Sequence, residues 1–235
     1  MTLATRATAA HPSGATPGAT PGADPAAYAR ELLVERLNRA LRRPADLGGL
    51  PAVRSLLDRL AADAGDAGDA ADAGAAAGTV WLADTNARLS DAALLRHCLT
   101  DPEVHVAAAQ YAEDAHRLGW LRPDRTLPAA GHAALVEGVL EWARADRDGA
   151  DVVAAYGPPS VTFGDPDPRR PKTLGYVGAD GRGPLVSFHL GHAPGRSGPV
   201  LLAARIGEPG DSFFRSDGGS EFTPSGDALL DAEGQ

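Results

Sequence analysis

The histidine pair His189-Leu-Gly-His192 has the spacing in this sequence that most resembles a metal-ligand motif. Two imidazoles at the end of a strand can face one ion if the glycine lets the chain curl. The neighbouring residues supply no third ligand, so we assign no metal and interpret the pair as polar ends of a strand. His189 is nevertheless the one residue for which we keep a catalytic role, as an acid/base or ligand. The sequence identifies no cofactor.

Two other pairs combine groups that could react together. His97 and Cys98 are adjacent in a predicted helix, where neighbouring side chains point about 100° apart, so the imidazole does not serve the thiol. Glu113 and His116 are one helical turn apart, a spacing that suits an ion pair or a general base. We interpret Cys98 as a buried structural residue and the second pair as part of a solvated helix surface.

The segment Gly164-Asp-Pro-Asp-Pro-Arg-Arg-Pro-Lys172 has the most unusual local composition. Its prolines stiffen the chain, and its basic side chains can hold a carboxylate or phosphate through charge-assisted hydrogen bonds. Two tyrosines are expected to flank it if the adjoining strands pair. The candidate binding residues are therefore Arg169, Arg170, Lys172, Tyr156 and Tyr176. The alternative interpretation is a long hairpin connection kept soluble by its charges.

Composition narrows the class of protein. A net charge of −9 opposes general attraction to nucleic acid or to anionic lipid. Cys98 is the sole cysteine, which excludes an intramolecular disulfide and fits a reducing cytoplasm. The chain starts without a signal-peptide pattern and has no uninterrupted apolar run of membrane-spanning length. We therefore expect a cytoplasmic protein that does not enter a membrane.

The first two thirds of the chain is predicted to be helical. Residues 1–24 are rich in Ala, Thr, Gly and Pro and indicate a disordered tail. Residues 25–150 carry apolar side chains at helical spacing in about five stretches. Residues 62–78 interrupt them with Asp-Ala-Gly repeats, which predict a low-complexity loop.

The region 151–235 is predicted to be rich in strands and to pack on the helices. Short apolar runs at 160–163, 173–177, 184–190 and 199–206 predict an antiparallel meander of four or five strands. In the third run Val186, Phe188 and Leu190 share one face while Leu185, Ser187 and His189 share the other, a pattern typical of a half-buried strand. Two similar segments, 125–135 and 221–230, each predict a strand that leads into a helix.

The sequence thus predicts an α+β fold, with an N-terminal helical bundle followed by a C-terminal antiparallel meander. We expect a non-catalytic binding or accessory protein that acts through the rigid charged loop on another protein or a small anionic ligand. The alternative is a small-molecule enzyme whose pocket lies between helices and sheet and uses His189, with Arg169 or Arg170 holding an anionic group. A third hypothesis is a winged-helix-like DNA-binding regulator built on residues 122–142, although the arginines of this region are scattered. The sequence does not determine the oligomeric state.

Overall fold

The chain has the α+β architecture that the sequence predicts. The computed structural model describes residues 24–66, 104–181, 183–207 and 219–233. Nearly all of the expected tail, most of the Asp-Ala-Gly loop and the helix expected around Cys98 lie outside these ranges. The helices within them are α1 (Pro25–Arg42), α2 (Gly49–Asp66), α4 (Val104–Arg117), α5 (Ala129–Trp142), α6 (Gly149–Tyr156) and α7 (Pro224–Glu233).

Five antiparallel strands form one sheet in the order in which they occur along the chain. They are β1 (Val161–Gly164), β2 (Lys172–Tyr176), β3 (Leu185–Gly191), β4 (Val200–Gly207) and β5 (Ser220–Phe222). The predicted meander is therefore confirmed, because each connection joins neighbouring strands. The register places Thr173 of β2 opposite His189 of β3, and the pairing of β3 with β4 shifts just after His189.

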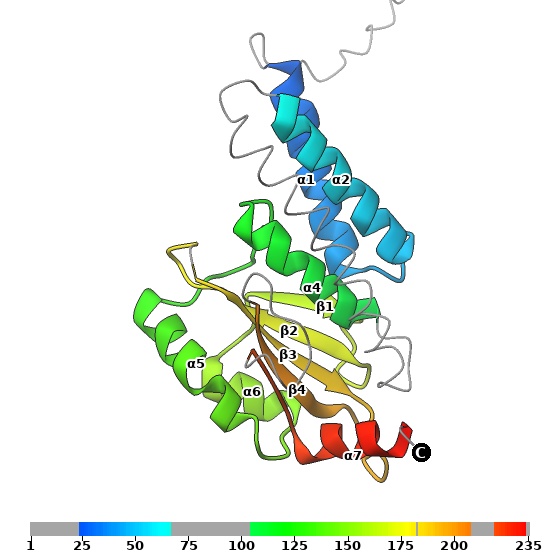
Figure 1. Cartoon of the computed structure of the whole chain (residues 1–235), viewed down its shortest axis with the longest axis vertical. Helices are drawn as coiled ribbons and strands as arrows, with labels where there is room; N and C mark the ends of the chain where they lie inside the picture. Colours follow the sequence, from blue (N-terminus) through cyan, green and yellow to red (C-terminus); the bar gives the residue numbers. More distant parts are fainter. Residues whose placement is uncertain (1–23, 67–103, 182, 208–218, 234–235) are drawn as a thin grey trace, which may run out of the picture.

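Helices cover both faces of the sheet, whereas the sequence pattern predicted only one covered face. Figure 1 shows α5 and α6 on one side of the strands and α4 on the other, with α1 and α2 beyond α4. Phe188 packs in a cluster with α5 and α6, and Leu185 packs in a cluster with α1, α2 and α4. All of β3 is consequently buried. The expectation of a half-buried strand is wrong because the polar side chains of its second face are enclosed under α4.

Two helix boundaries also differ from expectation. Helix α2 runs to Asp66, into the predicted loop. The alanines at the start of this loop have a high helix propensity, which favours continuation of the helix. Helix α6 was not predicted, since Val152 and Val153 are typical of strands. It is fixed by a capping box, in which Asp148 accepts hydrogen bonds from the amides of Ala150 and Asp151 and Asp151 accepts one from the amide of Asp148.

The two similar segments both join β structure to a helix, as predicted. Leu127 forms a parallel bridge with Gly178 just before α5, and β5 runs directly into α7. Asp146, beyond the end of α5, accepts a hydrogen bond of 2.9 Å from the amide of Ser225 at the start of α7. The chain just after α5 is therefore tied to the start of α7.

Candidate functional site

The connection between β1 and β2, residues 165–171 and here called the Asp-Pro loop, is held by its own polar groups. The Asp165 carboxylate accepts a hydrogen bond of 2.9 Å from the Asp167 amide. The Asp167 carboxylate in turn accepts one of 2.9 Å from the Arg169 amide. Lys172 donates from Nζ to the carbonyl oxygens of Asp165, at 2.7 Å, and of Asp167. Both carboxylates and the ammonium group thus maintain the shape of the loop.

This arrangement leaves two guanidinium groups on the loop surface. Arg169 and Arg170 are exposed, and neither side chain makes an ion pair or hydrogen bond within the ranges that the structure describes. Arg43, just after α1, reaches across from the helices and donates to the carbonyl oxygens of Gly164 and Arg42. Its charge is therefore met by carbonyl dipoles and not by a carboxylate. Residues 165–172 carry three basic and two acidic side chains, a net charge of +1 in a chain whose net charge is −9.

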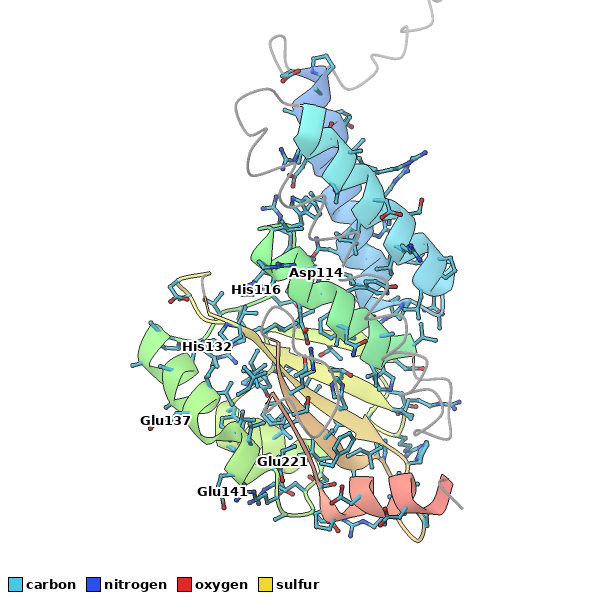
Figure 2. All side chains as sticks on the ribbon, in the orientation of Figure 1. Asp114, His116, His132, Glu137, Glu141 and Glu221 are labelled. Carbon is cyan, nitrogen blue, oxygen red and sulfur yellow. The ribbon has the colours of Figure 1, made fainter. Side chains whose placement is uncertain are left out.

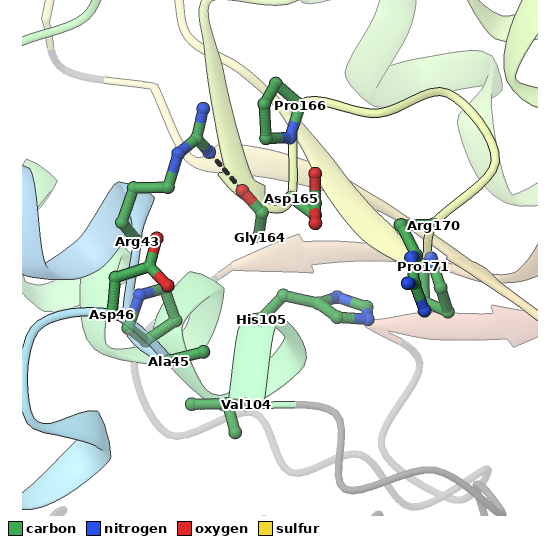
Figure 3. Close-up of a pocket in the computed structure, with 11 residues that line it drawn as sticks. Arg43, Ala45, Asp46, Val104, His105, Gly164, Asp165, Pro166, Arg170 and Pro171 are labelled. Carbon is green, nitrogen blue, oxygen red and sulfur yellow. Dashed lines mark hydrogen bonds between the residues drawn. The ribbon is translucent and has the colours of Figure 1, made fainter.

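A pocket lies on each side of the Asp-Pro loop, and Arg43 lines both. The smaller, of about 450 Å³, is drawn in Figure 3 and lies between the segment after α1, the start of α4 and the loop. It contains Arg170 and His105, together with the carboxylates of Asp46 and Asp165. The larger, of about 640 Å³, lies between the loop, the start of α6 and the end of the β3–β4 connection.

The larger pocket combines an apolar floor with basic side chains. Leu174, Leu190 and Val153 contribute apolar surface, and Arg43, Arg169 and Lys172 contribute positive charge; the remaining lining residues are Asp148, Gly149, Ala150, Thr162, Pro166, Pro168, Gly198 and Pro199. Among these described residues Asp148 carries the only carboxylate, and that group is engaged in capping α6. A volume of this size suits a small molecule.

Burial changes the pKa of Lys172, the basic residue at the end of the Asp-Pro loop. Lys172 is 6% exposed, and this burial lowers the pKa of its ammonium group, with the neighbouring Arg43 acting in the same direction and Asp165 and Asp167 opposing it. Burial is the main cause of this lowered pKa, and the attraction of each carboxylate exceeds the repulsion by Arg43. Lys172 and Arg43 both line the larger pocket, where their positive charges can pair with an anion.

His189 is enclosed between α4 and the sheet. Its Nδ1 lies 2.9 Å from the Thr173 hydroxyl, which also lies 2.9 Å from Nδ1 of His105. Since the hydroxyl has one proton, it donates to one ring and accepts from the other, so the two imidazoles hold opposite tautomers. Burial, reinforced by the charges of His105 and Arg205, holds the pKa of His189 well below its ordinary value. The ring is neutral at pH 7.

The enzyme hypothesis required His189 to face a pocket between helices and sheet. His189 is 1% exposed and lines neither the larger nor the smaller pocket. His105 does line the smaller pocket, but its Nδ1 is bonded to Thr173 and its Nε2 is buried. His192 is exposed while His189 is buried, so the two rings of the sequence pair point apart. The described residues contain no group of three or more His, Cys, Asp or Glu side chains arranged to hold a metal.

Glu113 and His116 have different partners from the ones their spacing indicated. Glu113 is buried and forms a two-pronged ion pair with Arg205 of β4, with Oε1 2.8 Å from Nε and Oε2 3.2 Å from Nη2. Nε2 of His116 instead lies 2.9 Å from the Gly183 carbonyl, and His132 makes the same kind of contact with Pro184. Figure 2 shows His116 and His132 reaching the same hairpin from α4 and α5. Glu113 is therefore buried and His116 half-buried, whereas both were expected on a solvated surface of α4.

The two tyrosines lie away from the Asp-Pro loop. Tyr176 is at the opposite end of β2 from the loop, and its hydroxyl donates to the Gly157 carbonyl at 2.8 Å. Tyr156 packs against Trp142, Phe188 and Tyr176, with ring centroids 5.3, 5.4 and 6.2 Å apart. The structure thus places Arg169 and Lys172 at the larger pocket and Arg170 at the smaller one, on the other side of the loop. Both tyrosines lie in the aromatic core.

Sequence reasoning missed the contribution of distant residues to this site. Arg43 meets Gly164 across 121 residues, and nothing in the Arg42-Arg43-Pro44 run indicates that contact. Val153 and Asp148 belong to the helix that was not predicted. The capping pattern Asp148-x-x-Asp151 is the one signal from which that helix could have been found.

No helix in the described ranges is both long enough and apolar enough to cross a membrane. The chain matches no protein-family model, no curated protein and no solved structure.

Proposed function

We propose that this chain is a non-catalytic binding protein that holds an anionic group of its ligand, a carboxylate or phosphate, at the Asp-Pro loop. The observation that carries the proposal is the internal use of Asp165, Asp167 and Lys172, which fixes the loop while leaving Arg169 and Arg170 exposed. A stiff loop limits the entropy cost of binding an oxyanion to the ordering of the arginine side chains, because the backbone that carries them is already fixed.

Neither alternative hypothesis gains similar support. The acid/base candidate His189 is sealed beneath α4, and its neighbour His105 presents no accessible ring nitrogen to the smaller pocket. On the DNA-binding side, Arg122 pairs with Glu31 at 2.9 Å and Arg125 donates to the Pro158 carbonyl. We further propose that the protein acts in the cytoplasm, as its single cysteine favours.

The test is an NMR titration of the full chain at low ionic strength with sodium acetate and sodium phosphate. We expect saturable shifts of the backbone amides of the non-proline residues in 165–172 and around Arg43, and these shifts should weaken as the salt concentration rises. Each exposed ion pair contributes up to about 1 kcal/mol. The double variant Arg169→Ala/Arg170→Ala is therefore expected to weaken binding by up to about thirtyfold.

The matched control is Arg36→Ala/Arg59→Ala, which removes two exposed arginines from α1 and α2 and so changes the net charge equally. We expect this control to bind both anions as the unchanged chain does. Equal weakening by the two double variants would mean that net charge, and not the loop, attracts the anion, and the proposal would fail.

A further inference from the structure

The larger pocket has a polarity that restricts the kind of anion it can hold. Lys172 and Leu190 lie directly opposite each other on β2 and β3, and Leu174 follows on the same face of β2. The side chain of Lys172 therefore lies next to the apolar side chains of Leu190 and Leu174 on the same face of the sheet. The covering helix α6 starts close by, since a Cβ on Gly149 would lie only 3.0 Å from Leu190 Cδ1.

Charge is distributed unevenly around this floor. The basic side chains Arg43, Arg169 and Lys172 come from the loop side, whereas Asp148 lies on the α6 side. The first amides of α6 already bond to Asp148, so the helix start does not compete for an anion. A carboxylate therefore fits beside the loop, and an uncharged portion of the ligand fits along the floor toward α6.

The outer edge of the floor is also apolar and exposed. Val153 of α6 is 39% exposed and lines the pocket. An apolar ligand body that covers Val153 and fills the space above Leu174 and Leu190 would remove this surface from water. A small inorganic anion would leave it uncovered. The pocket volume of about 640 Å³ is within the range found for organic ligands.

We infer that the larger pocket binds a monocarboxylate with an apolar chain, a medium-chain fatty acid being the simplest member of the class. The inference rests on the proposed anion site and adds the identity of its ligand. The carboxylate is held at Arg169, near Arg43 and Lys172, and the chain lies over Leu174, Leu190 and Val153.

Calorimetric titration with hexanoate, octanoate and decanoate, each below its micellar concentration, tests this directly. We expect one site per chain and an affinity that rises about fourfold for each added methylene, the equivalent of burying one CH₂ group. Acetate, octanol and an acidic tetraglutamate peptide serve as comparison probes. Octanol and acetate are each expected to bind at least tenfold more weakly than octanoate.

Two substitutions at adjacent exposed residues of α6 provide a matched pair. Val153→Asp places a carboxylate in the pocket and is expected to weaken octanoate binding at least tenfold. Ala154→Asp adds the same charge to the same helix at an exposed residue that does not line the pocket, and is expected to leave binding unchanged. Thermal unfolding of both variants establishes that each is folded.

The outcomes separate this inference from the proposed function. If acetate and phosphate bind at the loop but affinity does not depend on chain length, the anion site stands and the fatty-acid inference is refuted. If the acidic peptide binds more tightly than octanoate, the ligand is an acidic protein segment and the inference is again refuted. If no anion binds even at low salt, the proposed function itself fails.

Discussion

The buried pair of Glu113 and Arg205 gives the most demanding prediction about how this fold is held together. Their side chains are 3% and 2% exposed, so neither charge is hydrated. Removing one member of a buried pair typically costs 3–5 kcal/mol, because the other charge stays buried and loses the ion pair. Arg205 would keep its hydrogen bond to the Ser220 hydroxyl, which does not carry a compensating charge. We therefore expect Glu113→Leu to lower the free energy of unfolding by about 3–5 kcal/mol, a large share of the roughly 5–15 kcal/mol available to a domain.

Urea unfolding followed by circular dichroism measures this loss. The double variant Glu113→Leu/Arg205→Met removes both charges, and it should recover most of the stability because an apolar pair can fill the space. Glu141→Leu is the control, since Glu141 pairs with Arg144 at the surface and should cost less than about 1 kcal/mol. If Glu113→Leu costs no more than Glu141→Leu, the reasoning about the buried pair is refuted.

Three further predictions address titration, capping and helix propensity. His189 stays neutral in the fold but takes up a proton near pH 6.5 when unfolded, so it should lower the unfolding free energy by about 1.4 kcal/mol per pH unit below that value. Urea unfolding of His189→Gln at several pH values should show a weaker dependence of the unfolding free energy on pH. An unchanged dependence would contradict the assignment to His189. Asp148→Ala should cost about 1 kcal/mol through the lost cap of α6 while tightening octanoate binding in calorimetry; weaker binding would argue against the assigned polarity. Gly138→Ala, inside α5 with open space around the added carbon, should raise stability by about 0.5–1 kcal/mol in thermal unfolding, and a lower Tm would show a hidden contact.

The strands and most helices could be predicted because their signals are local. The four apolar runs between 160 and 206 lie within one residue of β1 to β4, and α1 begins at the predicted Asp24-Pro25 boundary. Asp24 accepts a hydrogen bond of 3.0 Å from the Ala26 amide, as a capping residue should. Strand positions and helix caps are determined by residues close together in the chain, so they can be predicted from one sequence.

The polar interior could not be predicted, since it depends on which surfaces meet. Residue types place Glu113 on a solvated helix surface and His189 at the polar end of a strand, yet both are buried, as is His105 of α4. Each finds its partner on another element: Glu113 on β4, and both histidines at Thr173 of β2. Burial of polar groups is tolerated because these hydrogen bonds compensate for lost water.

The candidate site was partly accessible from sequence. The proline-rich composition of residues 165–171 pointed to a stiff loop, and the basic residues beside it were named from their types alone. The floor of the larger pocket was not, because Leu174 and Leu190 look like ordinary core residues, and the structure buries both of them at the edge of that pocket. Arg43 follows the last residue of α1, and its contact with Gly164 depends on the tertiary fold and not on neighbouring residues.

Binding of an anion at the Asp-Pro loop should change the NMR resonances of the arginine side chains that contact the anion. We would record the Nε–Hε resonances of the arginines in the full chain while adding octanoate at low salt. We predict a saturable shift of the Arg169 resonance and no change in the resonance of Arg59 on α2. Shifts of similar size at both arginines, or none at Arg169, would contradict it.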